Sequence, residues 1–244
     1  MIYGCSLFQK GQVTVVPPVK RSGNFLQDLV NKAMQFDCIS IEGRLKLVLN
    51  GKEHPSVKIR VWLISKNNTS LVRIKGLGPF GVTVFDFLAK ENKAWIYLPR
   101  SGRVYKGEVF FTSYGNIDVK TAIKMIELIA NPWSPARYYD LEKTMCNINI
   151  SHLSCFKTRF LNNTVFFEYL DDLSPYRFYS QAFEILFKNE GDSGYPKRID
   201  FYLEKGAIKG RFVVSKVSFS PLDENSPLFD ESFFLKMLKI LKMS

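Results

Sequence analysis

The sequence has 244 residues, of which 46% are hydrophobic and 23% are charged, a balance that excludes an intrinsically disordered chain. The formal net charge is +11, so anionic surfaces are the expected partners, with nucleic acid and acidic phospholipid as the two candidates. No run of about 18 apolar residues occurs, so no transmembrane helix is expected.

Residues 1–20 are predicted to be a tether with a candidate lipidation site. Gly11, Pro17 and Pro18 fall in a stretch with little periodicity, which is typical of a linker. Gly4-Cys5 resembles the end of a bacterial lipoprotein signal peptide, in which the cysteine becomes lipidated. A chance Gly-Cys pair explains the same residues, because no basic region and no long apolar core precede it.

Three further cysteines, Cys38, Cys146 and Cys155, stand outside any C-x-x-C pair. Only His54 and His152 are available to join them, so no metal site is expected. Their apolar surroundings favour small buried side chains, and a disulfide between two of them would leave one unpaired.

Periodicity predicts a helix, a series of strands, a second helix and a second series of strands. Apolar residues recur at helical spacing over Asn24–Phe36 and again over Val119–Ala130, whereas the period between and after these segments is two. An amphipathic segment over Ser232–Met243 ends the chain, with lysines three apart on one stripe: Lys236, Lys239 and Lys242. The expected strands are Ile41–Leu49, Val57–Leu63, Leu71–Lys75, Val82–Leu88, Trp95–Pro99, Arg103–Val109, Cys146–Ile150, Leu153–Phe160, Val165–Leu170, Tyr176–Phe187, Arg198–Glu204 and Ala207–Phe219. One strongly curved antiparallel sheet is the economical arrangement, because near-closure protects the edges of so many strands.

The turn between Leu71–Lys75 and Val82–Leu88 carries apolar residues where polar ones are usual. Its sequence is GLGPFG, and its glycines and proline support a tight reversal with Leu77 and Phe80 near the tip. These two side chains either pack under a neighbouring loop or contact something outside the protein.

Catalytic motifs are weak. Residues 191–196, GDSGYP, resemble the nucleophile loop of chymotrypsin-like proteases, but the surroundings of His54 do not match that family, and a turn explains the same residues. Trp62, Trp95 and Tyr97 are candidates for base stacking on a sheet, yet they alternate with aliphatic neighbours as core residues do. We therefore expect no enzyme, no cofactor and no nucleic-acid partner.

Three short motifs resemble the LolA/LolB-like lipoprotein carrier and receptor proteins and related bacterial lipoproteins. They are Ile41-Glu42-Gly43-Arg44-Leu45, Leu71-Val72-Arg73-Ile74 leading to Gly78-Pro79-Phe80-Gly81, and Leu98-Pro99. The resemblance implies a mainly β fold with an α lid, a single unclosed antiparallel β-barrel of about 11 strands with helices over its open side. It places this half-barrel domain at residues 21–244.

The resemblance also implies a function. It suggests a lipid-anchored protein on the periplasmic face of the outer membrane, lipidated at Cys5, that binds acyl chains of lipoproteins or lipids for lipoprotein localisation. Phe80 stands where the LolB-like branch has a leucine that helps deliver lipoproteins, which makes Leu77, Pro79 and Phe80 the expected membrane or acyl contact. Its expected partners are acyl chains, the outer-membrane surface and a periplasmic carrier protein. The expected cavity residues are Leu47, Val61, Trp62, Phe85, Phe87, Trp95 and Phe167. The alternative is a non-catalytic structural or assembly lipoprotein with a packed barrel that binds another envelope protein.

Overall fold

The computed structural model describes residues 22–66, 69–112, 115–146, 152–160, 163–189, 194–203, 206–219 and 225–243. The expected tether over residues 1–20, with Cys5, lies outside this part of the chain, as do residues 191–193 of the protease-like motif. No described helix is long and apolar enough to cross a membrane.

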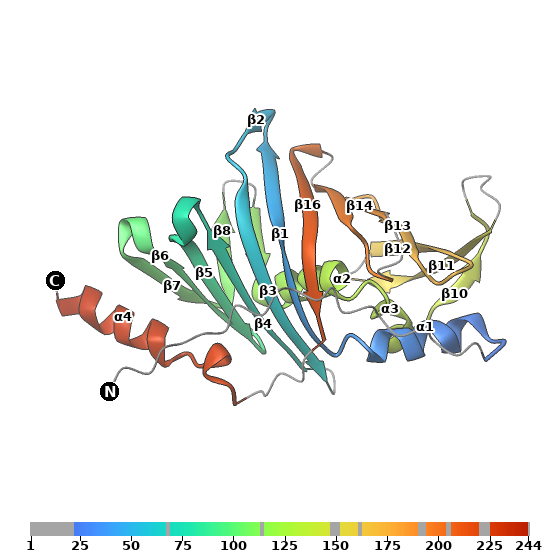
Figure 1. Cartoon of the computed structure of the whole chain (residues 1–244), viewed down its shortest axis with the longest axis horizontal. Helices are drawn as coiled ribbons and strands as arrows, with labels where there is room; N and C mark the ends of the chain where they lie inside the picture. The colour runs from blue at the N-terminus through green and yellow to red at the C-terminus, as the bar shows by residue number, and fades with distance from the viewer. Residues whose placement is uncertain are drawn as a thin grey trace.

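The described chain folds into one large antiparallel sheet, a separate two-stranded sheet of β8 and β9, and a few helices (Figure 1). The helices are α1 (Phe25–Met34), α2 (Val119–Ala130), α3 (Pro135–Tyr138) and α4 (Ser232–Met243). The first strands are β1 (Cys38–Leu49), β2 (Lys52–Glu53), β3 (Val57–Lys66), β4 (Thr69–Leu77), β5 (Thr83–Lys90), β6 (Lys93–Leu98), β7 (Arg103–Gly107), β8 (Val109–Thr112) and β9 (Gly115–Asp118). The later strands are β10 (Glu142–Thr144), β11 (Leu153–Phe160), β12 (Asn163–Leu170), β13 (Pro175–Tyr179), β14 (Phe183–Lys188), β15 (Arg198–Leu203) and β16 (Ile208–Ser218).

The sheet joins the two series of strands and stays open. Its order is β10-β11-β12-β13-β14-β15-β16-β1-β3-β4-β5-β6-β7, with β2 paired to β1, so β1 and β16 meet in the middle. Strands β10 and β7 are the two ends of this order, which leaves the barrel unclosed. The predicted fold class, an open and curved antiparallel sheet with a helical lid, is therefore confirmed.

The sheet has 14 strands where the sequence predicted about 11. One reason is that the expected strand Tyr176–Phe187 is a hairpin, β13 and β14. The Ser180 hydroxyl accepts hydrogen bonds from the backbone N–H groups of Ala182 (3.1 Å) and Phe183 (3.3 Å), which forms a turn inside that segment. Strand β10 precedes the expected strand Cys146–Ile150, most of which lies outside the described residues.

A disulfide joins Cys146 and Cys155, which corrects the prediction that both are small buried thiols. The reason is the antiparallel pairing of β10 with β11, which sets Thr144 opposite Cys155 and brings the Cα atoms of the two cysteines to 5.4 Å. Cys38 is not part of this bridge.

Alternating side chains give the sheet two apolar faces. Helices α1, α2 and α3 cover one of them, which we call the inner face, and Figure 1 shows α2 behind β1, β3 and β16 with α3 next to α1. Helix α1 begins at Asn24, whose side chain accepts hydrogen bonds from the backbone of Leu26 and Gln27. The largest fully buried side chains under these helices include Trp133, Phe36 and Phe167.

The opposite, outer face is covered by the C-terminal segment, residues 225–237. Phe229 and Phe234 pack on Ile64, Leu71 and Leu88 of β3, β4 and β5, where they form a second apolar cluster. This cluster explains why β3, β4 and β5 carry apolar side chains on both faces.

A buried ion pair lies beneath the C-terminal segment. Arg73 donates two hydrogen bonds to the Asp86 carboxylate, at 3.0 and 2.7 Å, and a third to the carbonyl of Leu228. Its guanidinium carbon is 5.7 Å from the ring centroid of Phe234. Both charged groups are almost fully buried, and Asp86 is the carboxylate that compensates Arg73, while Lys75 lies 3.6 Å from the same carboxylate.

We expect Asp86→Ala to lower the free energy of unfolding by about 3–5 kcal/mol, since it leaves the Arg73 charge buried without a partner. The double variant Arg73→Met/Asp86→Leu removes both charges and should recover most of that loss. Urea denaturation measures both effects. A double variant as unstable as Asp86→Ala would show that the charge pair is not what the outer face depends on.

Candidate functional site

On the inner face, the side chains of β4 and β5 become less buried towards the 77–82 turn. Val72 of β4 and Ala89 of β5 are fully buried beneath the helices, whereas Ile74, Phe85 and Phe87 of the same strands are only half-buried. The helices therefore cover one end of this face, and the end towards the 77–82 turn is left partly open.

Three glycines flatten the inner face. The Phe85 ring lies over Gly76, the Phe201 ring over Gly210, and the Phe212 ring over Gly43. A Cβ atom at Gly76 would come within 2.3 Å of the Phe85 ring, so the ring takes this position only because the neighbouring residue is glycine.

Eight half-buried apolar side chains of the strands lie on this face, and we call them the apolar wall. They come from β15, β1, β3, β4 and β5, which are neighbours in the sheet together with β16. The members of the wall are Leu45, Leu47, Val57, Ile74, Phe85, Phe87, Phe201 and Leu203.

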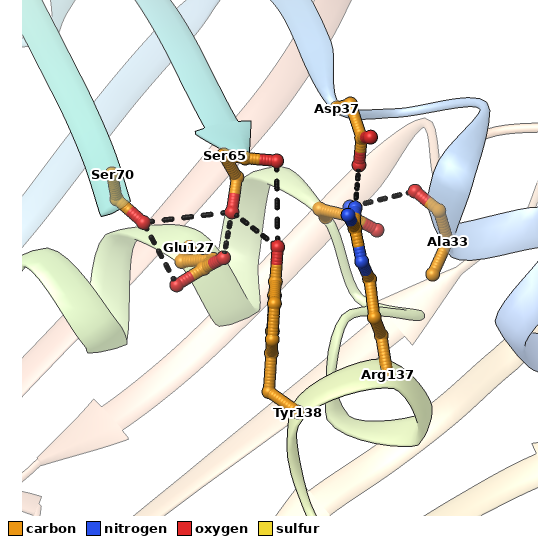
Figure 2. Close-up of polar contacts among 8 residues, drawn as sticks. Ala33, Asp37, Ser65, Ser70, Glu127, Arg137 and Tyr138 are labelled. Carbon is orange, nitrogen blue, oxygen red and sulfur yellow. Dashed lines mark hydrogen bonds and ion pairs between the residues drawn. The ribbon is translucent and has the colours of Figure 1, made fainter. Parts of the chain in front are cut away.

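A polar cluster fixes the helices to the ends of β3 and β4 (Figure 2). Glu127 of α2 is 2% exposed and accepts hydrogen bonds from the hydroxyls of Ser65 and, at 3.3 Å, Ser70. The Tyr138 hydroxyl of α3 lies 2.9 Å from the Ser65 hydroxyl, and Lys124 lies 3.7 Å from the Glu127 carboxylate. One carboxylate thus holds two strand ends and lies next to the tyrosine of a second helix.

The corner between α2 and α3 is held by buried side chains. Tyr195 donates to the carbonyls of Ile129 and Ala130, both at 3.2 Å, and Tyr169 donates to the carbonyl of Pro132 at 2.9 Å. Burial raises the pKa of both tyrosines above the ordinary range, so both stay protonated and able to donate. An ion pair between Arg137 and Asp37 ties α3 to the start of β1 (Figure 2).

The 77–82 turn carries the most exposed large apolar side chain among the described residues. Phe80 is fully exposed, at 104% of its reference area, and its neighbour Val82 is 64% exposed. Phe80 has φ of 59°, a left-handed conformation that costs a bulky residue about 1–2 kcal/mol. The turn is closed by a hydrogen bond from the Gly78 N–H to the Val82 carbonyl, at 2.8 Å, which holds the aromatic ring away from the sheet.

The expected cavity residues divide between three places. Leu47, Phe85 and Phe87 belong to the apolar wall, while Val61 and Phe167 are on the same face but buried in its packed core. Trp62 and Trp95 are on the outer face, where Trp95 lines a cavity of about 240 Å³ with Phe229 and Asp230. The structure therefore corrects the prediction that both tryptophans line the inner face. Side chains of adjacent strand residues point to opposite faces, so Trp62 and its neighbour Val61 are on different sides of the sheet.

The three residues of the turn that were expected to contact a membrane or acyl chain differ in exposure. Pro79 and Phe80 are exposed, whereas Leu77 is half-buried at the end of β4.

Sequence reasoning missed the polar cluster and the buried ion pair. Glu127 stands in the apolar stripe of its helix, four residues after the buried Ile123, and that position is the available signal. Arg73 and Asp86 are likewise charged residues inside apolar strands. An ionisable group on an apolar face needs a buried partner, although the sequence alone does not identify the partner.

Many solved structures share this fold, including those of three bacterial proteins. A DUF1329 family protein from Desulfovibrio piger is 15% identical, with a TM-score of 0.59, over 89% of this chain and 99% of that one. A putative outer membrane lipoprotein-sorting protein domain from Vibrio parahaemolyticus is 14% identical, with a TM-score of 0.58, over 86% and 97%. A LolA superfamily protein from Nitrosomonas europaea is 16% identical, with a TM-score of 0.52, over 85% and 98%.

No protein-family model and no curated protein matches the sequence. The structural likeness nevertheless extends over nearly the whole of each related chain, so the chain has a LolA/LolB-like fold. At these identities the comparison defines the fold class and leaves the function to be argued from the site.

We expect Glu127→Ala to lower the free energy of unfolding by about 2–3 kcal/mol, because the buried Ser65 and Ser70 hydroxyls lose their charged acceptor. Hydrogen–deuterium exchange should rise first in α2 and α3. Glu127→Gln keeps an acceptor oxygen and should show a smaller effect. Faster exchange spread evenly over β1 and β16 would contradict a local role in fixing the helices.

Proposed function

We propose that the protein is an envelope lipid-binding protein that receives acyl chains of lipoproteins or lipids on the apolar wall. The observation that supports this best is the wall itself, eight half-buried apolar side chains on the inner face that the helices leave partly open. Apolar surface that is uncovered yet flanked by a packed core is typical of a ligand site.

The chemistry of the wall suits an acyl chain and no polar ligand. Each methylene group that leaves water contributes about 0.8 kcal/mol, so a chain of about 12 carbons gains roughly 10 kcal/mol before the cost of ordering it. The rings laid flat over Gly43, Gly76 and Gly210 give the wall the smooth profile that a flexible chain can follow.

The 77–82 turn is the proposed membrane contact. Phe80 occupies an unfavourable backbone conformation for its type, and a polar or glycine residue would be more stable there. An aromatic ring that stays exposed in a strained backbone conformation is typical of a residue that contacts a partner outside the protein. The turn follows directly on Gly76 and precedes Phe85, so lipid at Phe80 is next to the end of the apolar wall.

The disulfide supports an envelope location. A bridge between Cys146 and Cys155 persists in oxidising compartments such as the bacterial periplasm and is rare in the cytosol. Lipidation at Cys5, attachment to the periplasmic face of the outer membrane and exchange with a periplasmic carrier are the finer parts of the same proposal. The shared fold of a putative outer membrane lipoprotein-sorting protein domain supports the link to lipoproteins in this proposal.

A packed barrel that serves assembly is the second candidate function. Phe167 and Phe178 are fully buried, so the half of the sheet formed by β11 to β14 has a filled inner face. The open wall lies in the other half, which is why we prefer acyl binding.

Leu47→Glu should abolish uptake of a fluorescent fatty acid, because it puts a charge on the apolar wall next to Leu45 of the same strand and face. Val213→Glu is the matched control, since Val213 is exposed on the outer face of the neighbouring strand β16 and should leave uptake unchanged. Fluorescence titration measures both. Equal uptake by the two variants would exclude the wall as the acyl site.

Phe80→Glu should leave the melting temperature within about 2 °C of the unchanged protein, because the ring is fully exposed. It should also abolish lipid transfer to vesicles, while Phe80→Leu, which keeps an apolar tip, should retain it. Unfolding of Phe80→Glu would show that the ring belongs to the core, and unchanged transfer would remove the turn from the mechanism.

A further inference from the structure

A second surface of the protein combines exposed cations with exposed aromatic rings. It comprises β7, which is the last strand of the sheet, the β5–β6 and β6–β7 turns, and α4, which lies against β7 at the sheet edge (Figure 1). We call this surface the basic edge. Its described cations are Lys90, Lys93, Arg100, Arg103, Lys106 and Lys236.

The cations of the basic edge are exposed, and none of the six has a carboxylate oxygen within 4.0 Å among the described side chains. Acidic groups do lie nearby, because Asp230 and Glu231 line the same cavity as Lys90. Hydrogen bonds from Ser232 and, to a smaller extent, the charge of Lys236 lower the pKa of the Asp230 carboxyl. The centre of the outer face differs, since Lys58 and Arg60 both pair with Glu42, at 3.1 and 3.0 Å. The six cations outnumber the acidic residues of the same described segments, Glu91, Glu108, Asp230 and Glu231, so the sheet edge has a net positive charge.

Exposed aromatic rings stand among these charges. Phe233 and Tyr105 are each 43% exposed, and Phe233 contacts Tyr97 edge to face at 5.6 Å on the outer side of the sheet. Tyr105 is on the inner side of β7, so the two rings flank the edge strand. The adjacent Phe234 is fully buried on the outer face, so it fixes the first turn of α4 in this position. The basic edge is therefore held in place before any partner binds.

The composition of α4 distinguishes between anionic partners. Its sequence is SFFLKMLKILKM, which contains only lysine and apolar residues apart from Ser232 and has no acidic residue. Lysine combined with phenylalanine, leucine and methionine is typical of helices that lie in a bilayer interface. Nucleic-acid surfaces instead use cations with polar side chains and do not need large aliphatic ones.

We propose that the basic edge docks on an anionic lipid bilayer. The lysine and arginine side chains contact the headgroups, and the Phe233 and Tyr105 rings enter the interface between headgroups and acyl chains. The 99–101 turn, which carries Arg100, lies at the same end of the sheet as the 77–82 turn because β5 and β6 are antiparallel. Docking by this edge thus brings Phe80 towards the same membrane.

The test uses the triple variant Arg103→Glu/Lys106→Glu/Lys236→Glu and vesicles of phosphatidylglycerol and phosphatidylcholine. Each cation near a membrane surface contributes about 1 kcal/mol, so we expect the affinity to fall roughly a hundredfold. Binding of the unchanged protein should also weaken in high salt. Pure phosphatidylcholine vesicles should bind poorly.

The matched control is Lys143→Glu/Arg159→Glu/Lys188→Glu, three exposed cations on β10, β11 and β14 in the other half of the sheet. It changes the net charge by the same amount and should lower the affinity less than threefold. Equal losses in the two triple variants would overturn the proposal, because total charge would then explain binding. Equal binding to pure phosphatidylcholine would also overturn it.

Two further readouts separate this proposal from its alternatives. Fatty-acid uptake from solution should be normal in the basic-edge variant, so a failure of acyl binding and a failure of docking give different results. A single-stranded oligonucleotide that binds the unchanged protein more tightly than the anionic vesicles do, and loses binding in the same variant, would overturn the proposal in favour of nucleic acid.

Discussion

The attachment of α2 and α3 to one end of the sheet determines how much of the inner face remains open. Glu127 accepts hydrogen bonds from Ser65 and Ser70 at the ends of β3 and β4, and buried tyrosines bind the corner between the helices. A short pair of helices anchored there covers the nearby half of the strands and leaves the apolar wall towards the 77–82 turn. The position of a buried carboxylate thus sets the position of the proposed ligand site.

The outer face is covered by the C-terminal segment, whereas the helices leave part of the inner face open. A sheet with apolar residues on both faces must cover both, and here the C-terminal segment covers the outer one. Arg73 and Asp86 lie under that segment, and the carbonyl of Leu228 completes the hydrogen bonding of the guanidinium. Covering the outer face also fixes α4 along β7, so the interaction that stabilises the sheet positions the basic edge as well.

Much of the fold followed from periodicity, and the errors have physical causes. Alternation predicted the strands on both sides of α2, because a period of two survives in strands whose faces differ in environment. Periodicity does not reveal which face a residue such as Trp62 occupies when both faces are apolar, and the tryptophans were assigned to the wrong side for that reason. The disulfide depended on the pairing of β10 with β11, which no local pattern encodes. The exposed Phe80 was predictable as one of two alternatives, since the turn sequence specifies the reversal but not whether a loop covers it.

The central claim is that acyl chains bind the apolar wall, and photo-crosslinking tests it most directly. A fatty acid that carries a diazirine in its chain is mixed with the protein, irradiated, and located by peptide mass spectrometry. The account predicts labels at Leu47, Phe85 and Phe87, with none at Val213 on the outer face. Labels confined to the outer face, or no label at saturating fatty acid, would contradict it.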